Sequence, residues 1–354
     1  MKKIISVISS LLIAGTLAFG FSACGSNGTD SGDTFQENFY YTAVCENGRT
    51  VSYTLRSIGS VSDAEIAIPS EYRGKPVTAI GESAFFNSKY ITGVTIPDTV
   101  ETIGKYAFNG CERLTRAELG NGVKTIEDGA FSYCVSLEKI SIPSSVRVIG
   151  SDVFNECTSL KEAVMEEGVQ RMGRSVFTGC YMLEEVIFPD SIMGVGEDAD
   201  GDYSMTATFM NCTGLKHVKL PEKLEFIPQW FFAGCQSLET VEIGKSVKSV
   251  GYSAFYDISS MKNLVLPASL VSCEGYSFHR LYGLEKVFFE GTAEQWAAIE
   301  IRRTDSGTQP LRASAKSALD DMFGSNVTVY FYSKNKPTGQ GNFWHYLQGA
   351  PAIW

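Results

Sequence analysis

The sequence is poor in the residues that most catalytic and metal sites need. Its 354 residues include only three histidines, His217, His279 and His345, which leaves little material for histidine-based catalysis or metal binding. No C-x-x-C pair, G-x-S-x-G, H-E-x-x-H or phosphate-binding glycine loop is present. We therefore predict that the protein is not an enzyme and that it has no cofactor and no metal site.

Positive charge is also scarce. The 30 lysines and arginines are outnumbered by 40 aspartates and glutamates, for a net charge of −10. A phosphate backbone would be repelled by such a surface, so we expect no nucleic-acid partner. With 44% hydrophobic and 20% charged residues, the chain has enough apolar material to bury a large core and is not disordered as a whole.

The N-terminus has the pattern of an export signal. A basic start, Met1-Lys2-Lys3, is followed by an apolar run over residues 4–21 and by small residues up to Cys24. A transmembrane anchor is the alternative, but the run is near the lower limit for a membrane span and ends in small residues rather than charge. We therefore expect residues 1–23 to be a signal peptide.

The residues on both sides of the expected cleavage point resemble a known sequence motif. Phe21-Ser22-Ala23-Cys24 resembles a bacterial lipobox, with Phe21 where leucine is usual. The resemblance implies a lipid on Cys24, which would hold the protein at a membrane by chain insertion alone. Residues 24–36 are polar enough to act as a flexible tether. We expect an exported protein that is lipid-anchored at the bacterial cell surface.

A repeat of 23 residues dominates the remaining chain. Phenylalanine recurs nine times at steps of 23, with a single step of 32 that marks an insertion of nine residues. Apolar residues keep the same step five positions before each phenylalanine and six and eleven positions after it. The template is V-x-x-I-G-x-x-A-F-x-x-C-x-x-L-x-x-V-x-I-P. The nine residues are Phe85, Phe108, Phe131, Phe154, Phe177, Phe209, Phe232, Phe255 and Phe278.

The template predicts a stack of coils. The end of L-x-x-V-x-I alternates, so its last two apolar residues share one face of a short strand. Proline then ends many of these strands, and glycines such as Gly104 and Gly150 are expected to supply turns on the other side. One unit cannot bury its own apolar side, whereas stacked units form a continuous core with the phenylalanines inside.

The core of the repeat resembles a known family. Gly104 to Cys111, read as GKYAFNGC, is a good example of the BspA-type bacterial leucine-rich repeat, and the resemblance covers residues 76–290. It implies a β-rich leucine-rich repeat solenoid of nine 23-residue coils, each with a short parallel strand. It also implies an N-terminal cap with a strand pair over residues 37–75 and a C-terminal α/β aromatic cap over residues 291–354. The family is associated with surface display, adhesion and protein binding.

Six of the nine cysteines occupy one repeat column. In-register stacking separates their Cβ atoms by about a coil spacing, which is more than the ~3.8 Å of a disulfide. The last two coils have Ile258 and Leu281 in this column, which indicates that apolar volume is sufficient there. We expect buried free thiols, with Cys273 the same in a neighbouring column, and find no obvious partner for Cys45. The six are Cys111, Cys134, Cys157, Cys180, Cys212 and Cys235.

The nine-residue insertion lies between Pro189 and Phe209 and is acidic. Carboxylates at alternate positions suit calcium, but Tyr203 stands where an EF-hand loop needs glycine, so a solvated acidic loop is the favoured interpretation. Calcium binding is kept as the weaker alternative. The four carboxylates are Glu197, Asp198, Asp200 and Asp202.

The outward side of the predicted strands is the candidate binding face. Repeated short strands form an extended, rigid platform that suits macromolecular ligands better than small ones. We expect a non-catalytic binding scaffold for an extracellular protein or matrix ligand, acting in adhesion, with a purely structural surface-layer role as one rival. The outward positions are Thr95, Glu118, Ser141, Val164, Ile187, Lys219, Glu242 and Val265.

Aromatic residues are concentrated near the C-terminus. They form either a stacking platform, which would make the protein a glycan-binding module, or a cap that closes the end of the solenoid. The cap is the favoured interpretation because an open stack needs one, and the glycan-binding surface module is the alternative function. The residues are Trp296, Tyr330, Phe331, Tyr332, Phe343, Trp344, Tyr346 and Trp354.

Overall fold

A computed structural model describes residues 34–36, 39–59, 64–192, 205–302, 322–323 and 326–354. Cys24, the expected signal peptide and most of the tether lie outside the described residues, as do the four carboxylates of the insertion. Within the described ranges, no helix has the length and apolar character needed to cross a membrane.

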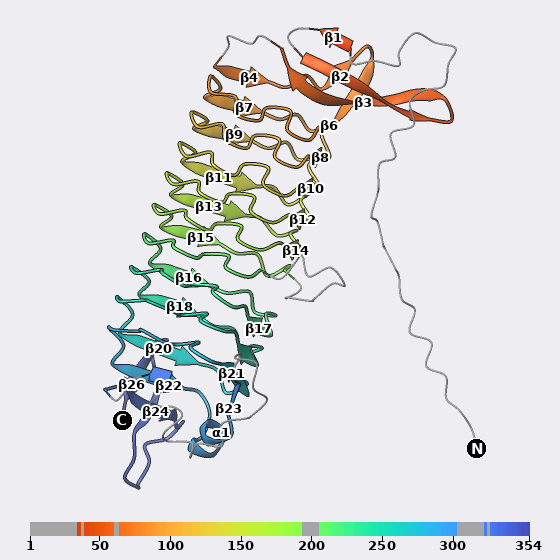
Figure 1. Ribbon diagram of the computed structural model, residues 1–354. Coiled ribbons are helices and arrows are strands. Elements are labelled where there is room, and N and C mark those ends of the chain that lie inside the picture. The colour runs from red at the N-terminus through yellow and green to blue at the C-terminus, as the bar shows by residue number, and fades with distance from the viewer. Residues whose placement is uncertain (1–33, 37–38, 60–63, 193–204, 303–321, 324–325) are drawn as a thin grey trace, which may run out of the picture.

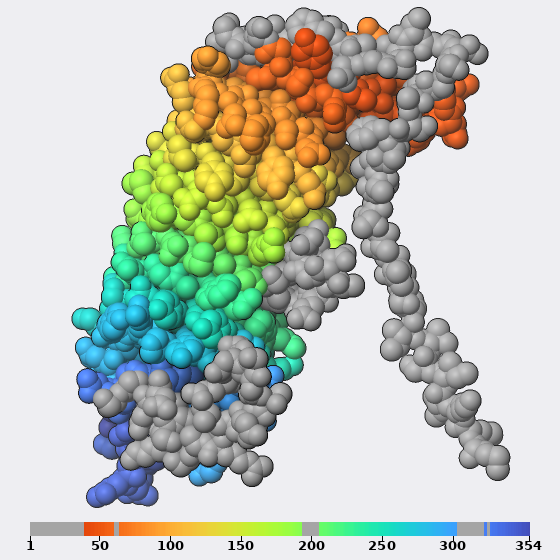
Figure 2. Space-filling view, in the orientation of Figure 1, coloured from red at the N-terminus to blue at the C-terminus, as the bar shows by residue number. Residues whose placement is uncertain are grey.

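The chain winds into an elongated stack of coils (Figure 1), and in the space-filling view each coil lies directly on the next (Figure 2). One side of every coil adds a short strand to a parallel ladder, which we call the strand face. It begins with an 8-stranded sheet and continues in a 5-stranded one. The strands are β4 (Glu65–Ala67), β7 (Gly93–Thr95), β9 (Arg116–Glu118), β11 (Lys139–Ile142), β13 (Glu162–Met165), β15 (Glu185–Ile187), β16 (His217–Lys219), β18 (Thr240–Glu242), β20 (Asn263–Leu266), β22 (Lys286–Phe289) and β24 (Thr328–Tyr332).

A second ladder runs along the opposite side of the stack. It is built mostly from two-residue strands that end in the isoleucine column of the repeat, so most of the described coils contribute two strands where the sequence predicted one. The leucine-rich repeat solenoid is confirmed with this addition. The strands are β6 (Lys75–Ile80), β8 (Thr102–Ile103), β10 (Thr125–Ile126), β12 (Val148–Ile149), β14 (Arg171–Met172), β17 (Phe226–Ile227), β19 (Ser249–Val250), β21 (Ser272–Glu274) and β23 (Glu300–Arg302).

Antiparallel strands cover the first coil. The strand pair predicted there is present as β2 (Phe39–Glu46) and β3 (Arg49–Ile58), with β1 (Thr34–Gln36) on β2 and β5 (Glu71–Tyr72) on β6. The rings of Tyr41 and Tyr72 stack at 4.2 Å beneath them. Cys45 of β2, for which the sequence showed no obvious partner, has its Sγ 3.8 Å from Thr50 Oγ1 of β3.

The last coil is followed by α1 (Ala293–Ala297), β25 (Phe343–Leu347) and β26 (Ala350–Ile353). Thr292 and Gln295 start α1 with a capping box, in which each side chain accepts a hydrogen bond from the backbone N–H of the other. β24 extends the strand face in parallel, and β26 returns antiparallel to β25. Parallel pairing therefore extends beyond residues 76–290 at both ends, to β3 and β4 before them and to β23, β24 and β25 after them, and the domain boundaries stay predictions.

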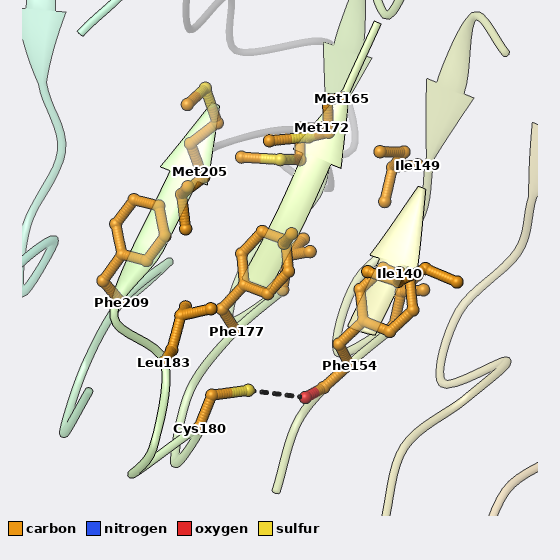
Figure 3. Packing of buried hydrophobic residues seen from close by; sticks show 14 of the residues in the cluster. Ile140, Ile149, Phe154, Met165, Met172, Phe177, Cys180, Leu183, Met205 and Phe209 are labelled. Atoms are coloured by element: carbon orange, nitrogen blue, oxygen red, sulfur yellow. Dashed lines mark hydrogen bonds between the residues drawn. The ribbon is translucent and has the colours of Figure 1, made fainter. Parts of the chain in front are cut away.

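The nine phenylalanines all point inward and are almost wholly buried. Neighbouring ring centroids are 4.7 to 5.7 Å apart, and most ring planes are nearly parallel. Figure 3 shows three of these rings with the aliphatic residues around them. Phe323 adds a further ring to the stack, 4.8 Å from Phe278. The separation of the two residues in the sequence does not follow the 23-residue step, so the repeat pattern does not reveal Phe323.

The six cysteines of the column are buried and form no disulfide bonds, as predicted. Each thiol of the column also donates a hydrogen bond to the phenylalanine carbonyl of the preceding coil. The Cys180 Sγ to Phe154 O distance is 3.2 Å (Figure 3), and the other five such distances are 3.0 to 3.2 Å. The column therefore provides a hydrogen-bond ladder in addition to apolar volume.

The predicted role of the glycine column is wrong in one respect. Gly104 and Gly150 do not adopt left-handed backbone angles, and a Cβ on Gly150 would lie 2.6 Å from the backbone nitrogen of Asp128 in the preceding coil. These glycines allow neighbouring coils to approach closely. The left-handed turn residues instead flank each phenylalanine at two positions before and two after, as at Ser83 and Asn87, with φ of 56° and 55°.

Candidate binding surface

The eight predicted outward residues lie together on the strand face. Strand pairing places Thr95 beside Glu118, Val164 between Ser141 and Ile187, and Lys219 beside Glu242. Six of the eight side chains are exposed, and the two valines, Val164 and Val265, are half-buried. The residues between them point into the core, because alternate residues of a strand face opposite sides.

The N-terminal end of the face is a fixed charge cluster. Arg116 donates hydrogen bonds to Glu118 and to Glu65, the latter at 2.8 Å. These hydrogen bonds, the one to Glu118 first, raise the pKa of Arg116 above its usual value. Thr95 Oγ1 donates to the other oxygen of Glu118 at 3.2 Å. The side chains here are held by one another, so this end offers a preorganised polar surface.

The middle of the face is apolar. Ser141, Val164 and Ile187 lie in one row across β11, β13 and β15, and Ile187 is 48% exposed. Beside this row, Lys139 donates to Glu162 at 2.7 Å, and that hydrogen bond raises the pKa of Lys139. Ile187 is the exposed apolar side chain of this uncharged row, and an apolar centre with a polar border is the arrangement of a protein-binding surface.

The next part of the face, on β16 and β18, is polar. His217 Nδ1 lies 2.6 Å from Thr240 Oγ1, and the Lys219 ammonium is 3.9 Å from Glu222. From β4 to β18 the strand face therefore changes from a charge cluster, through the row around Ile187, to a polar part.

Comparison with known proteins decides the family. The model of the BspA type leucine rich repeat region matches residues 78–200 and 205–299, in six copies. The chain belongs to this family. No curated protein matches its sequence.

One of the similar solved structures supports the fold of this BspA-type chain, and two others show a weaker similarity. A leucine-rich repeat protein from Bacteroides ovatus is 26% identical, with a TM-score of 0.63 over 84% of this chain and 71% of that one. A leucine-rich repeat protein of T. pallidum is 24% identical, with a TM-score of 0.45 over 72% of this chain and 91% of that one. One from Eubacterium ventriosum is 17% identical, with a TM-score of 0.45 over 84% and 77%.

Two of the C-terminal aromatic residues, Trp296 and Trp344, close the stack of this BspA-type protein. Trp344 is fully buried, and its Nε1–H donates to the carbonyl of Phe289 at 2.9 Å. Trp296 is buried between Phe289 and Phe323, at ring distances of 5.0 and 6.1 Å. These contacts are those of a cap on the last repeat.

The other six residues of this aromatic group remain at least partly accessible. Tyr332, Tyr346 and Trp354 are exposed, and Tyr330, Phe331 and Phe343 are half-buried. Tyr346 donates its hydroxyl to Glu290 at 2.7 Å, and partial burial, followed by this hydrogen bond, raises the pKa of its hydroxyl. Trp354 stacks on His345 at 3.8 Å. The platform predicted for glycans is thus reduced to three exposed rings.

The three histidines lie in separate places. His217 is on the strand face, His279 is in the turn of the last complete coil, and His345 is in β25. Among the residues that the structure describes, no three His, Cys, Asp or Glu side chains are arranged to hold a metal ion.

The sequence analysis missed one group of surface residues. Trp230 and Tyr276 stand two positions before their repeat phenylalanine, in the left-handed turn. Reading that column along the chain would have found them, because earlier coils have small residues such as Ser83 and Ser175 at the same place.

Proposed function

We propose that this BspA-type protein is an exported, lipid-anchored protein of the bacterial cell surface whose strand face binds an extracellular protein or matrix ligand, in adhesion. The observation that carries the proposal is the exposed row of Ser141, Val164 and Ile187 within a polar border on a rigid parallel ladder. Buried apolar centres with polar rims provide most of the binding energy at protein interfaces.

The rigidity of the face supports a macromolecular ligand. Most described coils are hydrogen-bonded to the next through two strand ladders, and a third set of bonds joins the turns. In one such turn, the backbone N–H groups of Ser83, Phe85 and Asn87 donate to the next coil at 2.7 to 2.8 Å. A surface with so little freedom loses little conformational entropy when it binds an extended partner.

The strand face is tested with a matched pair of substitutions in the same coil. Ile187→Glu charges the apolar row, whereas Met182→Glu charges a residue of nearly equal exposure, 49% against 48%, in the loop before β15. We expect binding of the full chain to immobilised fibronectin, laminin or collagen to fall at least tenfold for Ile187→Glu alone. Equal binding by both variants, or binding to none of the three proteins, would contradict the proposal.

The anchor is tested separately. When the full chain is expressed in a bacterium that is fed radioactive palmitate, we expect label in the protein and its recovery with membranes. Cys24→Ser should abolish both. Label that persists in the Cys24→Ser protein, or a wild-type protein without label, would remove the lipid-anchored role.

Glycan binding through the C-terminal aromatics is the less favoured alternative, because Trp296 and Trp344 are buried in the cap. Deletion of residues 336–354 should lower the melting temperature, since it removes Trp344 from the interior. An unchanged melting temperature together with loss of glycan binding would favour the alternative.

A further inference from the structure

The turns of three successive coils near the C-terminus carry a continuous group of aromatic side chains, which we call the aromatic corner. Trp230 contacts Tyr252 at a ring distance of 6.2 Å, and Tyr252 contacts Tyr276 at 5.8 Å. His279 lies 5.2 Å from Tyr276 and 6.0 Å from Tyr256. The corner belongs to the turns, and none of its residues is on the strand face.

Two of these rings are well exposed although their backbone is fixed. Trp230 is 41% exposed and Tyr276 is 57% exposed. Both are left-handed turn residues, with φ of 54° and 60°, and the backbone N–H of Trp230 donates to Tyr252 O in the next coil at 2.9 Å. The rings are therefore presented to solvent from a rigid turn.

The turn itself does not require aromatic residues. The same position holds Ser83, Asp152, Ser175 and Ser253 in other coils, with φ between 53° and 56°. Small polar residues therefore adopt this conformation equally well, and exposed tryptophan and tyrosine add apolar surface without serving the fold. Such surface indicates a ligand.

A cation lies at one end of the corner. The Arg280 guanidinium is 5.3 Å from the centre of the Tyr256 ring and is exposed. No ion pair joins it to a carboxylate of the described residues. Glu274, an acid of the same turn, accepts a hydrogen bond from the backbone N–H of Tyr252 at 2.9 Å. Asp257, half-buried, is the other acid of these turns.

We propose that the aromatic corner is a second binding site, which takes an acidic glycan. The C–H face of a sugar ring carries partial positive charge and is attracted to the negative face of an aromatic ring. The planar guanidinium of Arg280 matches a carboxylate or sulfate of the sugar with two parallel hydrogen bonds. Successive coils repeat at the strand spacing of about 4.8 Å, so Trp230, Tyr252 and Tyr276 form a row suited to a chain of sugars.

A glycan fits the corner better than a peptide does. The group contains no aliphatic side chain, and its polar components are ring edges, one imidazole and one guanidinium. The protein as a whole has a net charge of −10, so long-range attraction does not bring an acidic polymer to it. Binding of such a polymer would therefore depend on local contacts at this corner.

The experiment is affinity electrophoresis of the full chain in native gels that contain polygalacturonate or, as a neutral comparison, dextran. Each substitution introduces a residue that is already found at the equivalent repeat position of another coil. Trp230→Ser and Tyr276→Ser remove the exposed rings, and Arg280→Asn places the residue found at Asn87 and Asn211, where φ is 55° and 63°. Tyr106→Ser is the matched control, because Tyr106 is exposed at the same position of an early coil, with φ of 54°.

We expect polygalacturonate to retard the wild type and Tyr106→Ser equally, and dextran to retard them less. Trp230→Ser and Tyr276→Ser should weaken the interaction at least tenfold, and Arg280→Asn should abolish the preference for the acidic polymer. No retardation of the wild type, equal loss in Tyr106→Ser, or full retention in Trp230→Ser would overturn the proposal. Ile187→Glu should leave this binding unchanged, so failure here is distinguishable from failure of the strand face.

Discussion

The inward and outward sides of the same short strands repeat to very different degrees. In β7, β9 and β16, the inward residue is always small or branched and buried, whereas the outward residues are Thr95, Glu118 and Lys219. The inward positions must fit the same residue type in the coils above and below. The outward positions meet solvent, so they vary freely and carry whatever specificity the surface has.

The turns show the same contrast along the length of the molecule. In early coils, Lys105 pairs with Asp128 of the next turn at 3.0 Å, and the hydrogen bond to Asp128 raises the pKa of Lys105. In the last coils, the turns carry Trp230, Tyr252 and Tyr276 instead. One backbone conformation thus accepts two surface chemistries, and departures from the repeat are where function is to be sought.

The largest expected effect concerns the interior as a whole. Burial raises the pKa of the seven free thiols, to about 12 for Cys111, Cys157 and Cys273. The folded state keeps these protons while the unfolded chain releases them above pH 9, so stability is complete below pH 9 and falls towards pH 12. Each thiol contributes a loss of about 1.4 kcal/mol per pH unit in that window.

Urea unfolding between pH 7 and pH 11 measures this effect. The slope of the unfolding free energy against pH should be shallower by about 1.4 kcal/mol per unit in Cys157→Ala than in the wild type above pH 9. The two slopes should agree below pH 8. Equal slopes at high pH would show that the thiols are not buried as described.

The next effect concerns one ring of the stack. Phe154 is fully buried, with rings 5.7 and 5.5 Å away on either side. Phe154→Ala leaves a cavity that neighbouring coils cannot fill, so we expect a loss of about 3–5 kcal/mol in unfolding free energy. Tyr133→Ala, at an exposed turn position, should cost about 0.5 kcal/mol or less. Similar losses in both variants would contradict the inward orientation of the stack.

The stack was predictable because its signals are periodic. Nine phenylalanines at one spacing require one environment, and the inward side chains, buried thiols and outward strand residues all followed from it. The second ladder was missed because two residues, such as Thr102 and Ile103, are too few to show alternation. Phe323 was missed because the chain between it and Phe278 departs from the 23-residue step.

The candidate sites were predictable only in part, for a related physical reason. Positions facing solvent on the strands follow from the period, so the eight outward residues were found. Whether an exposed residue binds a ligand depends on its neighbours in other coils, which the period does not specify. Trp230 and Tyr276 are 46 residues apart in the sequence but are joined in the structure through Tyr252.

A smaller change in unfolding free energy is expected when a hydrogen bond of the C-terminal cap is removed, and its size should depend on whether that bond is buried or exposed. Trp344 Nε1 donates to the buried carbonyl of Phe289, and Trp354 Nε1 donates to Ser333 O, both at 2.9 Å. Trp344→Phe leaves an unsatisfied carbonyl in the interior and should cost about 1–3 kcal/mol. Trp354→Phe, at an exposed position, should cost much less because water replaces the lost donor. Chemical unfolding of the two variants checks the difference.

The smallest effect is expected at an ion pair on the strand face. Lys139 donates to Glu162 at 2.7 Å, but both side chains are exposed, so water compensates for most of the attraction that Lys139→Gln removes. The midpoint of urea unfolding should not change measurably, and added salt should not separate the variant from the wild type. Binding of the matrix proteins to the neighbouring row of Ser141, Val164 and Ile187 should nevertheless change. A partner bound to this row would exclude water from the ion pair of Lys139 and Glu162. A clear loss of stability without any change in binding to the matrix proteins would mean that the outward side of these strands serves the fold, as the inward side does.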